Sequence, residues 1–137
     1  MDTATLLHAI YKAYRENRLD DMMAYLDEDF RYVVHLPEMA VPGGDMPRNK
    51  ADTAALIAYI HETYDFLSFD PGPIIATDDK ATVQPLVRLR DKRTGKVLET
   101  KLAHSWRVRG GKGLELDERH DVSKVEAFIK SISEPDA

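Results

Sequence analysis

The sequence has no cysteine, no long apolar run and no basic block. Without cysteine, disulfides and thiolate chemistry are excluded. No stretch reaches the ~18 apolar residues of a membrane span, so no membrane association is expected. The start, MDTATLLHAIYKAY, lacks a basic segment followed by a long apolar one, so no secretory signal peptide is expected either. These absences predict a cytoplasmic protein.

Basic residues are also too few and too scattered for a nucleic-acid protein. The chain holds 19 Lys and Arg against 24 Asp and Glu, with a net charge of −5. Binding to a phosphate backbone uses clustered cations, so no nucleic-acid partner is expected. Repeats and low-complexity segments are absent. A length of 137 residues predicts a single domain over 1–137, with its core at about 4–132.

Helical spacing of apolar residues predicts three helices in the first half of the chain and one at its end. The first covers residues 3–17. Asp20 can cap a short second helix that runs through Leu26, and Asn49 can cap a third. Asp121 or Ser123 can cap the last helix, where SKVE (123–126) fits a capping box.

Strand patterns occupy most of the remaining sequence. FRYVVHL (30–36) predicts a strand, and PEMAVPGGDMPRN (37–49) predicts a long loop of the kind that forms lids or binding edges. From residue 67 the apolar period is two. In a strand over 97–109, the residues on one face are Leu98, Leu102, His104, Trp106 and Val108. The order of elements predicts an α+β domain with helices on one face of a curved antiparallel sheet.

Three landmarks carry a resemblance to a known family: the amphipathic first helix, NRLDDMMAYLDEDFRY leading into the first strand, and HSWRVRGGK followed by the ERHD strand end. With them the chain resembles the nuclear-transport-factor-2-like superfamily, and within it the SnoaL-like and ketosteroid-isomerase-like proteins. The resemblance implies a cone-shaped sheet that wraps a hydrophobic pocket closed by helices, and a homodimer. Members include isomerases, polyketide cyclases and proteins without catalytic activity, so the fold alone does not decide the function.

The segment ELDERHD (115–121) contains two interleaved sets of side chains. Leu114 and Leu116 set the inward face of the last strand, so Glu118 and His120 are expected to point into the pocket. Asp121 is expected to face outward as a helix cap, unless a bulge turns it inward.

His104 and Glu118 are the main catalytic candidates, with His120 and Asp121 beside them. Burial is expected to raise the pKa of Glu118 toward values useful for proton transfer. The resemblance implies that His104 stabilises a developing negative charge on oxygen, helped by His120 or a tyrosine. The alternatives are a core histidine at 104 and a buried ion pair between Glu118 and a histidine. A metal site of His104, His120 and Glu118 has no supporting ligand motif, so no metal or cofactor is expected.

Tyr14, Tyr32, His35 and Trp106 are candidate substrate-binding residues. Ketosteroid isomerases carry a first-helix tyrosine near Tyr11 or Tyr14, but core packing also explains both. Those isomerases have an aspartate before a proline at the end of the first strand, where this chain has Leu36 in HLPE. His35 or Glu38 could substitute only if the strand end twists. The hypothesis is therefore a cofactor-independent isomerase or cyclase for a small apolar, polyketide-like or steroid-like ligand. The alternative is a non-catalytic ligand-binding or dimerisation module.

Overall fold

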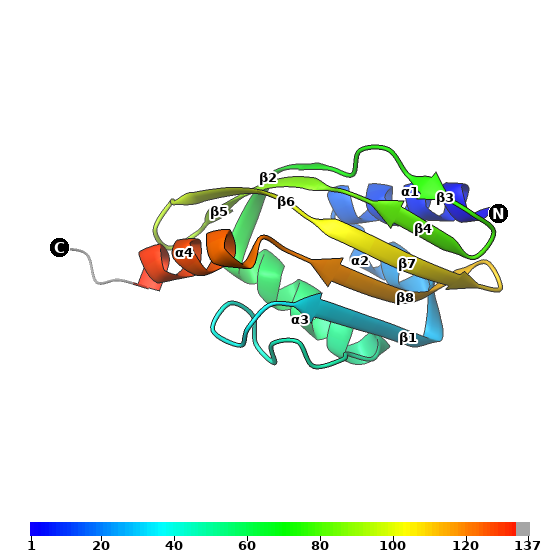
Figure 1. Ribbon diagram of the computed structural model, residues 1–137, viewed down its shortest axis with the longest axis horizontal. Coiled ribbons are helices and arrows are strands. Elements are labelled where there is room, and N and C mark those ends of the chain that lie inside the picture. The colour runs from blue at the N-terminus through cyan, green and yellow to red at the C-terminus, as the bar shows by residue number, and fades with distance from the viewer. Residues whose placement is uncertain (134–137) are drawn as a thin grey trace.

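Helices dominate the first half of the chain and strands the second. The computed structural model describes residues 1–133. The elements in chain order are α1 (Thr3–Arg15), α2 (Leu19–Ala24), β1 (Leu26–His35), α3 (Lys50–Thr63), β2 (Tyr64–Asp70), β3 (Ile75–Ala76), β4 (Lys80–Val83), β5 (Leu86–Asp91), β6 (Val97–Lys101), β7 (Ala103–Arg109), β8 (Lys112–Arg119) and α4 (Val122–Ser133). This mixed α+β order, with helices beside a curved sheet, confirms the predicted fold class (Figure 1).

The strands form a five-stranded sheet in the order β1-β8-β7-β4-β3 and a three-stranded sheet in the order β2-β5-β6. Every pair is antiparallel except β1 with β8, which run parallel. The sequence did not indicate this parallel pair. It places β8, the strand that carries Glu118, between β1 and β7.

The single strand predicted over residues 97–109 is two strands, β6 and β7, which belong to different sheets. They meet at Leu102, whose backbone N–H donates to the carbonyl of Pro85 at 2.8 Å, in register with the β5·β6 ladder that pairs Leu86 with Lys101. The alternation of faces nevertheless continues through the junction. Leu98, Thr100, Leu102, His104 and Trp106 are all buried, as a period of two requires.

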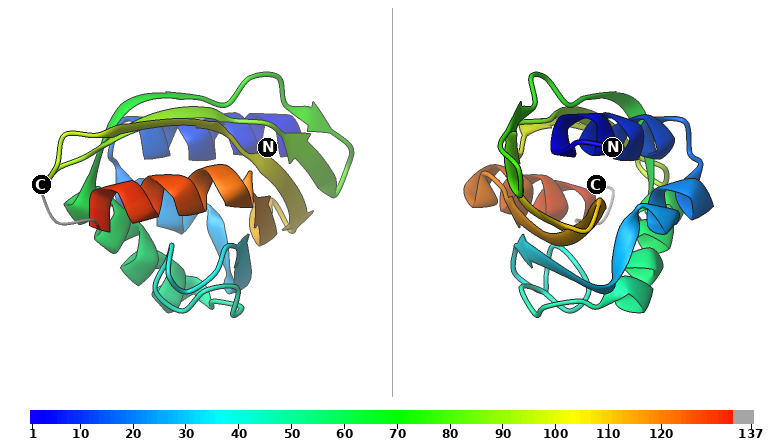
Figure 2. Two further views of the ribbon diagram at one scale, coloured as in Figure 1. Left: turned by 60° about the vertical axis from the view of Figure 1, so that its left-hand side comes forward. Right: turned by 90° about the vertical axis from the view of Figure 1, so that its right-hand side faces the viewer.

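Helices α1, α2 and α3 lie on one side of the sheets, and the strands curve around them (Figure 2). Asp2 caps α1 by accepting the N–H of Thr5, and Leu6, Leu7 and Ile10 form its buried face. Asn49 caps α3, as predicted. In α2, Asp20 lies within the first turn and is not the cap, because the helix already begins at Leu19.

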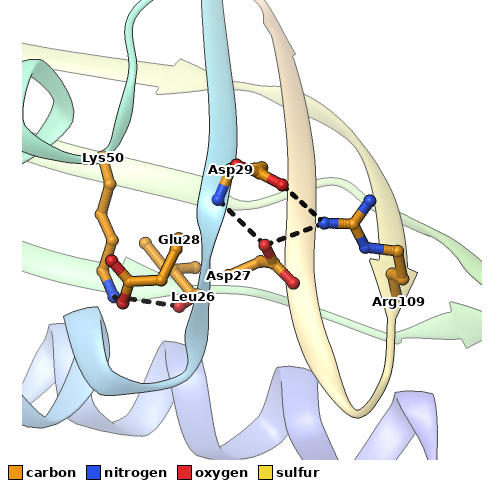
Figure 3. A network of polar contacts seen from close by, with 6 residues as sticks. All are labelled: Leu26, Asp27, Glu28, Asp29, Lys50 and Arg109. Atoms are coloured by element: carbon orange, nitrogen blue, oxygen red, sulfur yellow. Dashed lines mark hydrogen bonds and ion pairs between the residues drawn. The ribbon is translucent and has the colours of Figure 1, made fainter.

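The start of β1 is held by a polar network (Figure 3). Arg109, at the end of β7, donates to the carboxylates of Asp27 and Asp29 at 3.0 Å each. On the other side, Lys50 at the start of α3 donates to the carbonyl of Leu26 and to Glu28. The strand begins at Leu26, earlier than the apolar run FRYVVHL suggested, because Leu26 already pairs with Gly113 of β8.

The loop between β1 and α3 is closed by Arg48. Its backbone exchanges both hydrogen bonds with Tyr32, so the free edge of β1 is partly covered. Its buried guanidinium donates to the carbonyls of Pro42, Gly44 and Met46. The loop is therefore folded against β1, and Ala40 and Val41 form part of a cavity wall.

Candidate active site in the cavity of the curved sheet

A mainly apolar cavity of about 130 Å³ lies between the sheets and the helices. Its wall comes from α1, β1 and the loop after it, α3, β2, β5, β6, β8 and α4. The polar side chains in the wall are Tyr14, Tyr32, Tyr59, Tyr64, Thr100, Glu118 and His120. A smaller cavity of about 60 Å³ adjoins it, with Tyr14, Tyr32 and Glu118 in both walls and His104 in its own.

Sheet register brings the acid and a histidine together. In the β7·β8 pair, His104 lies directly opposite Glu118, and on the other side Val34 of β1 is the partner of Glu118. Directly opposed side chains on one face have Cβ atoms about 5 Å apart, close enough for a side-chain hydrogen bond. The prediction from parity that His104 and Glu118 share an interior face is confirmed by these contacts.

Glu118 is the centre of a buried chain of hydrogen bonds. His104 Nε2 lies 2.7 Å from Glu118 Oε1, and His120 Nε2 lies 2.7 Å from Glu118 Oε2. On the far side of His104, its Nδ1 lies 2.6 Å from the hydroxyl of Tyr11, which accepts the indole N–H of Trp106 at 2.9 Å. A single pattern of donors satisfies all four contacts: Trp106 donates to Tyr11, Tyr11 to His104, and both histidines donate from Nε2 to the carboxylate.

The two histidines reverse the expected pKa shift of Glu118. Burial alone would raise the pKa of this carboxyl. The hydrogen bonds from His104 and His120 outweigh burial, with a further contribution from the positive charge of either ring when it is protonated, and hold the pKa well below its usual range. The expectation of a raised pKa was wrong because it considered burial without these two donors. Glu118 is therefore an anion at neutral pH and a weak proton acceptor.

The tyrosines of the wall remain protonated. Burial, followed by the nearby Glu118 carboxylate, raises the pKa of Tyr14, and the same two causes lead for Tyr32. Burial also raises the pKa of Tyr64 to about 12. Among residues 1–133, the hydroxyl of Tyr14 has no hydrogen-bond partner. The hydroxyl of Tyr14 is a donor available to a ligand oxygen, whereas that of Tyr32 is within hydrogen-bonding reach of Glu118.

Two further polar atoms of the wall are buried without a partner in the described part of the chain. They are Nδ1 of His120 and Oγ1 of Thr100. Buried polar atoms in proteins are nearly always hydrogen-bonded, so an unpaired atom beside a cavity marks a contact point for a ligand or water. In the neutral form of His120, donation from Nε2 to Glu118 leaves the lone pair on Nδ1.

Two of the predicted site residues lie away from the cavity. His35 is on the outer face, where its Nε2 contacts Asp117 at 2.9 Å, because Tyr32 and Val34 take the inward positions of β1 and the strand end does not twist. Asp121 is exposed and accepts the N–H of Lys124 as the cap of α4. No bulge turns it inward. Trp106 lines the smaller cavity and contacts Tyr11, not the larger cavity.

Sequence reasoning gave too little weight to Tyr11 and missed Thr100. Tyr11 was interpreted mainly as core, and its link to His104 depends on how α1 crosses the sheet, which no pattern in the sequence specifies. Thr100 could have been found, because it is the one polar residue between Leu98 and Leu102 on the inward face of the strand.

Neither a metal cluster nor a membrane helix is present in residues 1–133. No group of three or more His, Asp or Glu side chains there could hold a metal ion. None of the described helices is both long and apolar enough to cross a lipid bilayer.

Comparison with known proteins identifies the family. The model of the SnoaL-like domain matches residues 7–116, so the chain belongs to this family. No curated protein matches the sequence. Among solved structures, TerC co-crystallised with polyporic acid has a TM-score of 0.81 at 17% identity, over 93% of this chain and 97% of that one.

Two other solved structures share the fold. IdmH from Streptomyces antibioticus, a candidate polyketide cyclase, gives a TM-score of 0.76 at 18% identity, over 93% of this chain and 97% of its own. A candidate isomerase from Rhodopseudomonas palustris gives 0.78 at 14% identity, over 90% and 92%. Others are described as NTF2-like proteins from Burkholderia species. At these identities the likeness shows the nuclear-transport-factor-2-like fold.

Proposed function

We propose that this protein binds a small, mainly apolar molecule in the larger cavity and transfers a proton at a carbon next to a carbonyl, without a cofactor. The observation that carries the proposal is the buried Glu118 carboxylate, which accepts a hydrogen bond from His104 on one oxygen and from His120 on the other. A buried anion in a largely apolar cavity is costly, and proteins place such groups at functional sites.

In this proposal His120 is the general base and Glu118 orients it. A carboxylate that accepts a hydrogen bond from one ring N–H fixes the tautomer of the histidine. The other ring nitrogen is then free to act as a base, as in catalytic triads. The free nitrogen, Nδ1, is the buried unpartnered atom of the wall. The role first predicted for Glu118, proton transfer, is reassigned to His120 because the pKa of Glu118 is lowered.

The reaction step balances with groups of the cavity wall. A C–H bond next to the carbonyl breaks, its proton bonds to Nδ1 of His120, and its electron pair forms the C=C bond of an enolate. The enolate oxygen takes the negative charge and accepts a hydrogen bond from Tyr14, whose raised pKa keeps it protonated. Glu118 stabilises the imidazolium. In a ligand with a C=C bond at its β,γ-carbons the enolate is a dienolate, and return of the proton from His120 to the γ-carbon completes an isomerisation; return to the α-carbon gives exchange alone. His104 holds the carboxylate from the opposite side.

The relatives support a small-molecule ligand. TerC was crystallised with polyporic acid, and IdmH is a candidate polyketide cyclase. A cavity of about 130 Å³ is close in size to an engineered apolar cavity that binds benzene. A compact cyclic ketone is therefore a suitable probe. Residence in the cytoplasm stays a prediction from the sequence.

Exchange of α-protons tests the proposal. Cyclohexanone dissolved in D₂O with the protein should lose its α-proton NMR signal faster than in buffer alone. His120→Gln keeps an amide donor for Glu118 but removes the base, so the rate should fall on the order of 10²–10⁴-fold. The control is His35→Gln, which alters a histidine that also contacts a carboxylate but lies on the outer face. It should leave exchange unchanged.

The same experiment decides between the two classes of function. If cyclohexanone binds the protein but its exchange is not accelerated, the protein is a ligand-binding module. If His120→Gln exchanges protons as fast as the native chain, a different group is the base and the proposed mechanism is wrong.

A further inference from the structure

Thr100 is a buried hydroxyl with no bonding partner. It lies on β6, its side chain faces the larger cavity, and the residue is 3% exposed. Its Oγ1 contacts no donor or acceptor within residues 1–133. An unsatisfied buried hydroxyl destabilises a fold, whereas valine of nearly the same shape would not.

Thr53 shows how this chain treats a buried threonine that serves only the fold. It is 2% exposed, and its Oγ1 donates to the carbonyl of Asn49 at 2.8 Å. Thr100, on a strand, has no such carbonyl within reach. The contrast indicates that the hydroxyl of Thr100 is used by something that enters the cavity.

The position of Thr100 along the wall is set by strand register. Ala103 pairs with Arg119 in the β7·β8 ladder, so His120 extends toward the level of Leu102. Thr100 lies two residues beyond Leu102 on the same face, about 7 Å further along the chain direction. That spacing exceeds the span of one hydrogen bond, so a ligand oxygen that meets Thr100 differs from the oxygen that lies near His120.

The charges of the wall restrict the ligand further. Among the described residues that line the larger cavity there is no lysine or arginine, and Glu118 is an anion. A carboxylate or phosphate on the ligand would meet a like charge without a counterion, which is strongly unfavourable in an apolar site. The ligand that fits is neutral.

We propose that Thr100 is a specificity-determining residue that donates a hydrogen bond to a second ligand oxygen, and that the site takes a neutral ligand with two separate oxygens. This rests on the proposed function of the cavity. One ligand oxygen accepts from Tyr14, and the other accepts from Thr100.

Two matched ligands and two matched variants test the inference. The probes are 1,4-cyclohexanedione and cyclohexanone, which differ in the second oxygen, with binding followed by NMR titration. The native chain should bind the dione roughly five- to tenfold more tightly, beyond the factor of two from its symmetry. Thr100→Val should abolish that preference, and Thr53→Val should retain it. Absence of the preference in the native chain, or its persistence in Thr100→Val, would overturn the inference.

Thermal unfolding without ligand gives an independent test. Thr100→Val should keep or raise the Tm, because it removes an unpaired hydroxyl. Thr53→Val breaks an existing hydrogen bond and should lower the Tm by about 2–4 °C. An equal loss in both variants would mean that Thr100 is satisfied within the fold or by a structural water, and the inference would be wrong.

These outcomes separate the inference from the proposed function. A Thr100-dependent preference for the dione without α-proton exchange would refute proton transfer and support Thr100 as a ligand-binding residue. Exchange that depends on His120, together with an unchanged preference in Thr100→Val, would refute the role of Thr100 and leave proton transfer supported.

Discussion

At the scale of single residues, Glu118 combines two properties that usually conflict. It is buried, which disfavours charge, and it accepts strong hydrogen bonds on both oxygens, which favour charge. The second property dominates, so the carboxylate serves to hold two imidazole rings in fixed tautomers. In the proposed mechanism, Glu118 therefore acts by orienting His120 and not through its own proton affinity.

Glu118→Gln should remove α-proton exchange and leave the overall fold in place. The amide presents an N–H group to one histidine, so at least one ring must change its tautomer or lose its partner. The exchange rate should fall on the order of 10²–10⁴-fold, as measured by NMR in D₂O. Asp121→Asn is the control, because an amide caps α4 about as well as a carboxylate and exchange should survive. Equal loss in both variants would contradict the site described here.

The depressed pKa of Glu118 also predicts an acid-dependent stability. A carboxyl whose pKa is lower in the folded than in the unfolded state stabilises the fold above its unfolded value, near 4.5, and loses that contribution as the pH falls toward the folded value. Glu118→Gln lacks this stabilising contribution at every pH. Between pH 7 and pH 3 the native chain should therefore lose about 2 kcal/mol of unfolding free energy relative to Glu118→Gln. Urea titrations at pH 7 and pH 3 measure the difference. A gap between the two proteins that does not narrow at pH 3 would argue against the shift.

The alternation of side chains along the strands predicted which residues face the interior. The sequence did not predict which hydrogen-bond partners those residues have. Glu118, His104 and His120 face inward because of a period of two that is visible in the sequence. The lowered pKa and the roles of Tyr11 and Thr100 depend on which side chains meet across strands and helices. These contacts are set by the register of the strands and by the position of the helices. Local sequence patterns specify neither.

At the scale of elements, the loop between β1 and α3 depends on one side chain. Arg48→Lys should destabilise the protein by about 1–3 kcal/mol, because a single ammonium group cannot satisfy three carbonyls spread over residues 42–46. Hydrogen exchange in residues 37–47 should increase, since the loop loses its fixed end. Arg31→Lys, an exposed change on the same strand that leads into the loop, serves as the control. Unchanged protection of the loop in Arg48→Lys would show that other contacts hold it.

The helices and the strand FRYVVHL were predictable because amphipathic periods and caps are local signals. The division of residues 97–109 into β6 and β7 was not predictable. The inward face continues through Leu102, while the partner strand changes from β5 for β6 to β4 for β7. The parallel pairing of β1 with β8 was also hidden, since the two strands are far apart in sequence and have no pattern that specifies each other.

At the scale of the whole molecule, the outer face of β5 and β6 is the expected contact between two copies of the chain. Leu86 and Val97 are exposed there by 44% and 42%, among Arg88, Arg90 and Glu99. A face with apolar groups and both signs of charge can pair with itself around a twofold axis. Sedimentation should give twice the chain mass of 15.5 kDa at micromolar concentration, and Leu86→Lys should shift it to the single mass. A native monomer would refute this contact.

The parallel pair of β1 and β8 has a consequence for how the protein is made. Val34 and Glu118 are partners across more than eighty residues, so the cavity wall cannot close until nearly the entire chain has left the ribosome. Contacts of such high sequence separation form slowly, because loop entropy is lost before they are gained. Until then β1 and β7 each present an open edge where β8 will lie, and such edges invite pairing between nascent chains. Slower synthesis of the last thirty residues should therefore increase aggregation more than slower synthesis of the first thirty.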